Sequence, residues 1–218
     1  MNDAPGVDPM LVGKWLRGWA ASREKPPPVA VAGGWRVEVN EPDQRARYVF
    51  PQAGEEARAF MHDNAPPLTP IKICAPPDAV AALLAPPWVI DRVAPMMQLP
   101  ALRAESDARL GEGYALTLTG AHPIILALAI AGNGDVAAGG RLVLIDDVAV
   151  FDQIQTSEAY RRKGLGRAVM RGLESAAAQR GARLAMLVAT EAGCALYTSI
   201  GWRVCCAYTT VIVAPAQP

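Results

Sequence analysis

Residues 160–167 read Tyr-Arg-Arg-Lys-Gly-Leu-Gly-Arg, between a strand-like pattern that ends at Thr156 and a helical pattern that begins at Leu165. Two glycines separated by one residue let the backbone approach a ligand closely, and successive N–H groups then point into one concavity. The following helix adds the positive end of its dipole. Five cations lie in or just after this stretch: Arg161, Arg162, Lys163, Arg167 and Arg171. The stretch therefore predicts a loop that binds a pyrophosphate group.

The spacing of the glycines narrows the kind of loop. The P-loop pattern GxxxxGK[ST] is absent, and the dinucleotide fingerprint GxGxxG would need Gly or Ala where Val169 stands. The pattern that fits is Arg-x-x-Gly-x-Gly over residues 161–166. On this loop alone, a basic helix start that holds no ligand remains the alternative.

A second pattern follows about 30 residues downstream, where residues 195–202 read Ala-Leu-Tyr-Thr-Ser-Ile-Gly-Trp. A Leu-Tyr pair near the end of a short helix is followed there by glycine and an aromatic residue. Together the two patterns resemble the GNAT acetyltransferases, which hold coenzyme A with an Arg-x-x-Gly-x-Gly loop. The resemblance covers roughly residues 113–213, about half of the chain.

The periodicity around these motifs predicts an α/β fold, and the resemblance implies a GNAT-like mixed, mostly antiparallel sheet flanked by helices. Strands are expected at 114–119, 124–131, 136–145, 148–156, 184–189 and 203–213, and helices at 165–180 and 192–199. Residues 100–112 are charged and have no sustained period, so we expect a boundary there between domain 1–100 and domain 101–218.

The first hundred residues predict a helix at 10–21 and then a smaller α/β module. Its strands are expected at 35–39, 47–50, 71–74 and 88–99, and its helices at 55–61 and 78–84. An ungapped shift of 114 residues places Trp88 on Trp202 and Leu83 on Tyr197. We interpret this as a shortened, inactive GNAT-like copy; an unrelated strand–helix–strand unit is the alternative.

The turn at residues 119–123 is too short for the two helices that GNAT members usually insert there to wall the acceptor site. The wall must then come from another part of the chain. The N-terminal helix, with Trp15 and Trp19, is the nearest supplier.

The resemblance implies acetyl-CoA as the acetyl donor, with no metal. The pantetheine arm is expected between strands 148–156 and 184–189, paired with the backbone of residues 154–156, while the amides of residues 162–167 hold the pyrophosphate. Thr190 stands where the family often has Asn and can still donate a hydrogen bond. The implied donor-binding residues are Ile154, Gln155, Thr156, Arg161, Arg162, Lys163, Gly164, Leu165, Gly166, Arg167 and Thr190.

The resemblance also implies that an amine attacks the thioester directly while Tyr197 protonates the departing thiolate. A phenol is protonated at neutral pH and can act as a general acid; a core tyrosine is the alternative. Asp152 is the acid on the strand where many members place a basic Glu, although it could equally be a solvated strand residue. Glu191 and a chain of water molecules are further candidates for the base.

Composition limits the partners. With 21 basic and 21 acidic residues the formal net charge is zero, so we expect no nucleic-acid partner. The longest apolar run, residues 124–131, is far shorter than a membrane span, and the N-terminus lacks a secretory pattern, so we expect a cytoplasmic protein. The expected acceptor is an amine of a small molecule or a protein. The last strand is a candidate for pairing in a homodimer. A coenzyme-A-binding sensor or scaffold is the alternative function.

Overall fold

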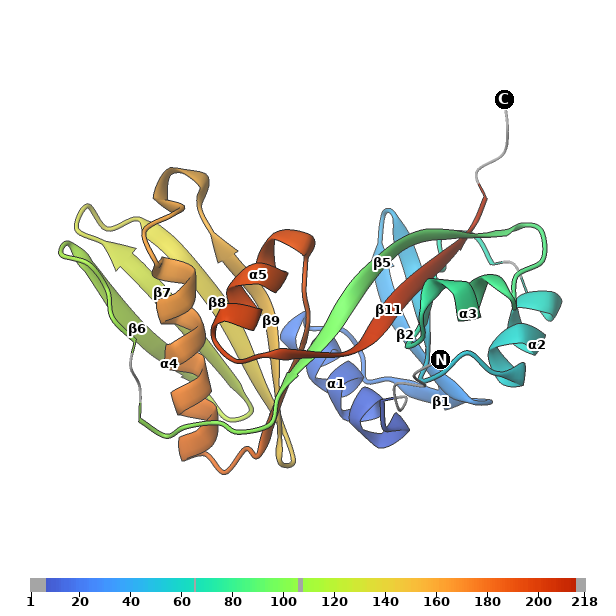
Figure 1. Ribbon diagram of the computed structural model, residues 1–218, viewed down its shortest axis with the longest axis horizontal. Helices are drawn as coiled ribbons and strands as arrows, with labels where there is room; N and C mark the ends of the chain where they lie inside the picture. Colours follow the sequence, from blue (N-terminus) through green and yellow to red (C-terminus); the bar gives the residue numbers. More distant parts are fainter. Residues whose placement is uncertain (1–6, 65, 106–107, 215–218) are drawn as a thin grey trace.

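The computed structural model describes residues 7–64, 66–105 and 108–214, whose strands form one 11-stranded sheet in the order β1-β2-β3-β4-β11-β5-β10-β9-β8-β7-β6 (Figure 1). The strands of the first half are β1 (Val29–Val31), β2 (Gly34–Glu41), β3 (Gln44–Phe50), β4 (Ile71–Ile73) and β5 (Trp88–Leu99). Those of the second half are β6 (Tyr114–Ala121), β7 (Ile124–Ala131), β8 (Val136–Ile145), β9 (Val148–Thr156), β10 (Leu184–Val188) and β11 (Arg203–Val213).

Helices cover both faces of this sheet. They are α1 (Pro9–Ser22), α2 (Glu55–Asp63), α3 (Pro77–Ala81), α4 (Leu165–Gln179) and α5 (Glu191–Ser199), with a 3-10 turn, η1, at Glu158–Tyr160. The predicted mixed, mostly antiparallel sheet flanked by helices is confirmed. The sequence reading missed β1 and η1, which are each three residues long and too short to develop a period.

The two halves of the chain exchange their last strands. β5, from the first half, pairs antiparallel with β10 of the second half, with Leu99 opposite Ala185. β11, the last strand of the chain, pairs antiparallel with β4 of the first half, with Thr210 opposite Lys72. β5 and β11 also pair with each other along most of their length and run through the centre of the molecule (Figure 1). The sheet is therefore continuous across the expected boundary at residues 100–112.

The central part of the sheet is symmetric about the β5–β11 pair. On one side β11 is followed by β4 and β3, which are parallel to each other; on the other side β5 is followed by β10 and β9, which are also parallel. The 114-residue shift places β4, α3 and β5 on β10, α5 and β11. The same succession of elements thus occurs twice along the chain.

Helix α1 lies on one face of the sheet, against β8 and β9. Asp8 caps its first turn by accepting a hydrogen bond from the amide of Met10 at 2.8 Å. Lys14 binds Asp147 at 2.6 Å, in the turn between β8 and β9, which fixes the helix along these strands. Its apolar side joins a core that includes Val150 of β9 and Met186 of β10. The opposite face is covered by α4 in the second half and carries a separate core.

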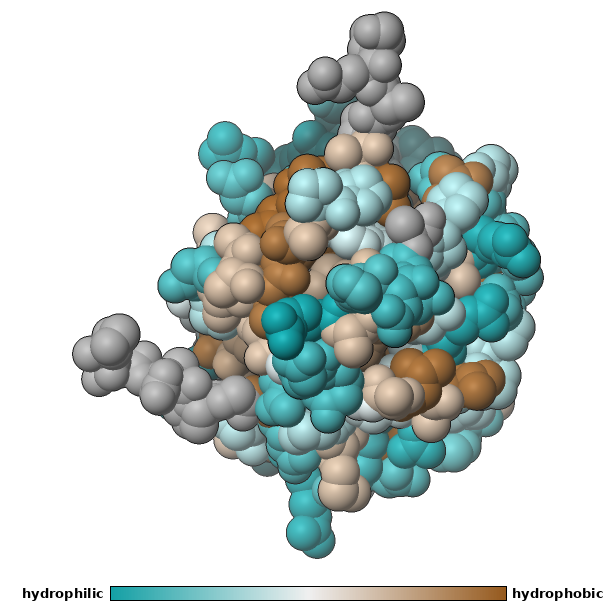
Figure 2. All heavy atoms as spheres, turned by 90° about the vertical axis from the view of Figure 1, so that its right-hand side faces the viewer, coloured by the Kyte–Doolittle hydropathy of each residue, from teal (hydrophilic) through white to brown (hydrophobic). Residues whose placement is uncertain are grey.

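The last strand is not an edge strand. β11 has β5 on one side and β4 on the other, so its backbone is already paired and cannot extend a sheet across a dimer, contrary to the basis of our expectation. Figure 2 looks onto the end of the molecule formed by the first half, where small hydrophobic patches alternate with hydrophilic ones. That the protein forms a homodimer stays a prediction, but pairing through β11 can no longer be its reason. In the described part of the chain no helix is long and apolar enough to cross a membrane.

The strand exchange predicts that the second half cannot fold alone. A fragment of residues 101–218 lacks β5, which separates β10 from β11, so both strands lose a neighbour and the apolar surface it covers. We expect this fragment to show no cooperative thermal transition by circular dichroism, whereas the full chain shows one. A folded fragment with the donor affinity of the full chain would contradict this arrangement.

Candidate active site

A bulge in β9 sets the directions of the side chains at the centre of the sheet. Asp152 pairs with Arg141 of β8 and Gln155 pairs with Gly139, so β9 takes three steps where β8 takes two. The extra residue is accommodated by Gln153, whose φ is +55°. As a result Asp152 contacts the end of α1, whereas Ile154 packs into the core on the α4 side.

Beyond this point β9 and β10 separate. They pair in parallel only from Val148 with Leu184 to Val150 with Met186. β10 continues beside β5, where Val188 pairs with Met96, while β9 continues beside β8. The backbone of residues 151–156 therefore faces a gap on its β10 side, into which an extended ligand can fit as an additional strand.

The loop before α4 presents backbone N–H groups at one side of this gap. Gly164 is the N-cap of α4 with φ +77°, a conformation that glycine adopts without strain, and Arg162 has φ +65°. Ala168 makes the first helical bond to the Gly164 carbonyl at 3.1 Å, which leaves the amides of the first turn without helical acceptors. A Cβ at Gly166 would lie 3.3 Å from the Thr156 hydroxyl, so a larger residue at this position would narrow the space between the loop and β9. This is the geometry of a phosphate site.

A cavity of about 1030 Å³ joins this loop to the gap, and we call it the donor cavity. It brings together almost all of the predicted donor-binding residues with Tyr197: Ile154, Gln155, Thr156, Arg161, Arg162, Gly164, Leu165, Gly166, Arg167 and Thr190. Lys163 does not line it, because its Nζ donates to the Tyr114 hydroxyl at 3.0 Å and lies over the Tyr160 ring. Arg171 is bound to Glu174 at 2.8 Å.

Tyr197 lies on α5 with its ring 7% exposed at the wall of the donor cavity. Its ring packs near Trp202, which is itself fixed by a hydrogen bond from Nε1 to Glu174 at 2.7 Å. Burial raises the pKa of the Tyr197 phenol to about 12, so the group keeps its proton throughout the neutral range. Thr190 caps α5 by accepting a hydrogen bond from the Gly193 amide at 3.1 Å, which leaves its own hydroxyl proton available to a ligand.

A second cavity, of about 690 Å³, lies on the α1 side, and we call it the acceptor cavity. Trp15 and Trp19 of the N-terminal helix line it, so this is the cavity to which the predicted acceptor wall would belong. Thr190 lines both cavities, so the two spaces meet where β9 and β10 separate. A thioester at that point would be reached from both sides.

Asp152 lies in the acceptor cavity and not in the donor cavity. One of its oxygens accepts hydrogen bonds from Arg23 Nε and from Ser22 Oγ, both at 2.8 Å, and the other accepts from Arg23 at 3.0 Å. The carboxylate is therefore held in one orientation by the residues that end α1. Glu191 lines the same cavity.

The sequence reading missed the residues at the other end of the acceptor cavity. Arg47 of β3, Lys72 of β4 and Tyr208 of β11 line it together. One signal was present: Lys72 is the only polar residue in the apolar run Ile71–Cys74, where a strand with both sides buried has no reason to carry a charge. The proximity of these three residues depends on the exchange of β5 and β11, and no local sequence pattern predicts that exchange.

A family model described as the acetyltransferase (GNAT) family matches residues 91–202, just over half of the chain. The chain belongs to the GNAT family. Members of this family transfer acyl groups from acyl-CoA to amines, and acetyl-CoA is their donor. The family match begins inside β5 and ends directly before β11, so it includes the loop and Tyr197.

Solved structures share the fold over nearly the whole chain. A GCN5-related N-acetyltransferase from Kribbella flavida has 16% identity and a TM-score of 0.67, and the match covers 97% of this chain and 98% of that one. A GCN5-related N-acetyltransferase from Sphaerobacter thermophilus has 11% identity and a TM-score of 0.62, with 97% and 96% covered. A search of curated proteins found no significant match. The likeness therefore includes the first half of this GNAT protein.

The GNAT donor loop predicts a paired effect of two substitutions. Gly164 and Gly181 lie just before and after α4, both have positive φ, and a Cβ at either would meet open space. Glu at 164 places a negative charge at the pyrophosphate position, whereas Glu at 181 adds the same strain and charge at the other end of the helix. In the native protein, acetyl-CoA at about 100 times its Kd should add about 2.7 kcal/mol, a rise in Tm of about 5–11 °C.

We expect G164E to lose this rise and G181E to keep it, both measured by thermal unfolding with and without acetyl-CoA. Equal rises in Tm in the two variants would show that the loop is not part of the donor site.

Proposed function

We propose that this GNAT protein is an N-acetyltransferase that moves an acetyl group from acetyl-CoA to an amine by direct attack, with Tyr197 as the general acid. The observation that carries the proposal is the position of Tyr197 at the wall of the donor cavity, beside the point where the acceptor cavity opens through the β9–β10 gap. Two substrates approaching from opposite sides can meet there without a covalent enzyme intermediate.

The chain's own groups suit the donor. The first-turn amides of α4 and the side chains of Arg161, Arg162 and Arg167 supply hydrogen-bond donors and positive charge for a pyrophosphate. Arg167 is also bound to Ser199 at 3.0 Å, which connects the loop to α5. The unpaired edge of residues 154–156 offers N–H and C=O groups to the amide-containing pantetheine arm.

Tyr197 suits a general acid because it is protonated and shielded from water. As the C–S bond breaks, the departing thiolate gains negative charge in a site with little solvent. A buried phenol that donates its proton there stabilises this charge, and the reaction leaves a thiol and a phenolate that regains a proton from solvent. The raised pKa means that loss of this proton does not limit activity below about pH 11.

Asp152 is the proposed base. Its carboxylate faces the acceptor cavity, where it can attract an ammonium group and accept a proton as the amine attacks. The contacts with Arg23 and Ser22 fix its direction but also compete with proton uptake. Glu191 and a chain of water molecules along the cavity are the alternatives for this role.

That competition favours a second candidate function. If Asp152 serves only to hold Arg23 and α1, the protein binds coenzyme A without turnover, as a sensor or scaffold. The two functions share the donor cavity and differ in the need for Tyr197.

We also propose that the first half is a degenerate GNAT module. It repeats the succession β2, β3, α2, β4, α3, β5 that the second half has as β8, β9, α4, β10, α5, β11. It lacks an Arg-x-x-Gly-x-Gly loop, and Leu83 stands where the 114-residue shift places Tyr197. Its role would be to complete the sheet and to wall the acceptor cavity.

Removing the phenol oxygen tests the enzyme proposal. We expect Y197F to lose about 10²-fold or more in kcat while the KM for acetyl-CoA stays near its native value, because the oxygen acts on the leaving group and not in donor binding. The matched control is Y48F on β3, outside both cavities, which should keep native kcat. Coenzyme A release in steady-state assays with an amine panel measures both.

Native turnover in Y197F would exclude the general-acid role. Donor binding without turnover of any amine by the native protein would favour the sensor or scaffold function.

A further inference from the structure

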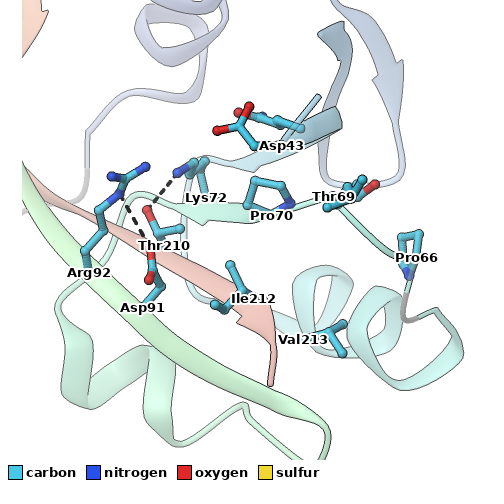
Figure 3. A pocket seen from close by; sticks show the side chains of 12 residues that line it. Asp43, Pro66, Thr69, Pro70, Lys72, Asp91, Arg92, Thr210, Ile212 and Val213 are labelled. Atoms are coloured by element: carbon cyan, nitrogen blue, oxygen red, sulfur yellow. Dashed lines mark hydrogen bonds and ion pairs between the residues drawn. The ribbon is translucent and has the colours of Figure 1, made fainter. Parts of the chain in front are cut away.

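The far end of the acceptor cavity is basic. Lys72 lies at the centre of β4 and is 4% exposed. Its Nζ donates to the Thr210 hydroxyl of β11 at 2.9 Å. Thr210 is also the register partner of Arg92 on β5, so Lys72, Thr210 and Arg92 form a row across three strands. Figure 3 shows a neighbouring cavity that shares Lys72, Arg92 and Thr210 with the acceptor cavity. In it the charged ends of Lys72 and Arg92 point toward one another, and Asp43 and Asp91 are also among the lining residues.

Arg47 adds a third cation from β3. Its guanidinium lies over the Trp19 ring, 3.8 Å from the ring centroid, and donates to Gln44 at 3.0 Å. In the part of the chain that the structure describes, neither Arg47 nor Lys72 forms an ion pair with a carboxylate. Arg92 is mostly exposed and has Asp91 at 3.6 Å. Among the described residues, the buried cations Arg47 and Lys72 therefore have no carboxylate bound to them at this end of the cavity.

Two buried polar atoms at this end are also without a partner. Among the described residues, neither Arg47 Nε nor the Tyr208 hydroxyl makes a hydrogen bond, and Tyr208 is only 5% exposed. The two groups lie close together: a contact between the Arg47 guanidinium and the Tyr208 hydroxyl contributes to the pKa shifts of both, but it falls short of a well-formed hydrogen bond. Buried polar atoms are normally hydrogen-bonded, so this poorly satisfied pair can take a further partner such as an anion.

The charge on Lys72 is sensitive to what occupies the cavity. Burial, helped by the nearby cations Arg47 and Arg92 and partly opposed by Asp91, lowers its pKa to about 7. An anion placed among these groups would favour the protonated amine and offset the repulsion between the three cations.

The two carboxylates that line this cavity lie at its opposite end. Arg23 already pairs with Asp152 there, and Glu191 follows Thr190, which lines both cavities. Lys72 and Val188 are on strands three positions apart in the sheet, so about 14 Å separates their backbones across the strands. An occupant with a positive amine at one end and a negative group at the other matches this distribution of charge.

We propose that the acceptor is an amine that also carries an anionic group, a carboxylate or a phosphate, and that Arg47, Lys72 and the Tyr208 hydroxyl bind that group. The proposal rests on the proposed function only in taking the occupant of this cavity as the acceptor. The anion fixes one end of the molecule at β3, β4 and β11, and the amine then lies at the β9–β10 gap. Trp15 and Trp19 cover the apolar part between the two charges.

Matched pairs of amines test the proposal without requiring turnover. Each pair contains an ω-amino acid and the ω-amino alcohol of the same chain length, taken over a series of lengths. Isothermal titration calorimetry of the full chain, with coenzyme A present to fill the donor cavity, gives a Kd for each compound. We expect the amino acid of the best length to bind at least about tenfold more tightly than its alcohol. Equal affinities at every length would overturn the proposal.

Substitutions locate the effect. We expect K72M and R47Q each to remove most of the preference for the acid, whereas K72R keeps it because the charge remains. The matched control is R58Q, which removes an exposed cation of α2 on the other face and should keep the native preference. Should K72M fail to fold, R47Q and Y208F provide the same test. A preference that survives both R47Q and Y208F would place the anion elsewhere.

The pH dependence gives an independent readout. Between pH 6 and pH 8 native Lys72 loses most of its protonation, so acid binding should weaken by up to about tenfold while alcohol binding stays constant. The other charged groups near Lys72 are Arg47, Arg92 and Asp91, and Asp43 lines the neighbouring cavity that Lys72 also lines. K72R should show a flat profile. A flat profile in the native protein would exclude Lys72 from the anion site.

A failure of the enzyme proposal can be distinguished from a failure of the anion-site proposal. If Y197F and the native protein are both inactive with every amine, but the acid still binds in preference to the alcohol, the anion site stands and only the enzyme proposal fails.

Discussion

The antiparallel pairing of β5 with β11 is the contact on which both cavities depend. It carries the last strand of each half into the sheet of the other half, so β10 has β5 as its neighbour and β4 has β11. β5 contributes residues 92–95 to the acceptor cavity, and β11 contributes Tyr208 and Thr210. Without the exchange, Lys72 and Asp152 would belong to separate sheets. The acceptor cavity is thus a product of the whole chain and not of the GNAT segment alone.

The separation of β9 from β10 leaves one cavity on each face of the sheet, the acceptor cavity on the α1 side and the donor cavity on the α4 side. The bulge at Gln153 turns Asp152 toward α1 and Ile154 toward α4, so two residues that would share a face in a regular strand line different cavities. α1 approaches β9 so closely that a Cβ at Gly18 would lie 2.5 Å from Val150. Ion pairs with the β8–β9 turn and with Asp152 fix the middle and the C-terminal end of the helix. The tryptophans of α1 are therefore positioned by the same strand that borders the donor cavity.

The donor half of the site could be predicted because its residues are close in sequence. The loop at 161–166 and the Leu-Tyr pair at 196–197 are local patterns, and four strands of the second half have the predicted bounds because turn residues delimit them. The acceptor half could not be predicted, since Arg47, Lys72 and Tyr208 come from three separated strands. Their meeting depends on strand order, which periodicity does not encode. Asp152 was identified as an acid near the centre, but its pairing with Arg23 needed the position of α1.

The exchanged strands also constrain how the chain is made. β4 ends at Ile73, yet its neighbour β11 begins only at Arg203, so β4 is synthesised long before the strand with which it pairs. Until then one edge of β4 and the apolar side of β5 are uncovered, and neither half can close its sheet by itself. Long-range pairing of this kind slows folding and exposes strand edges to other chains. The first half is therefore expected to complete its sheet only after β11 has been synthesised, in contrast to the domain-by-domain folding of proteins whose modules keep their own strands.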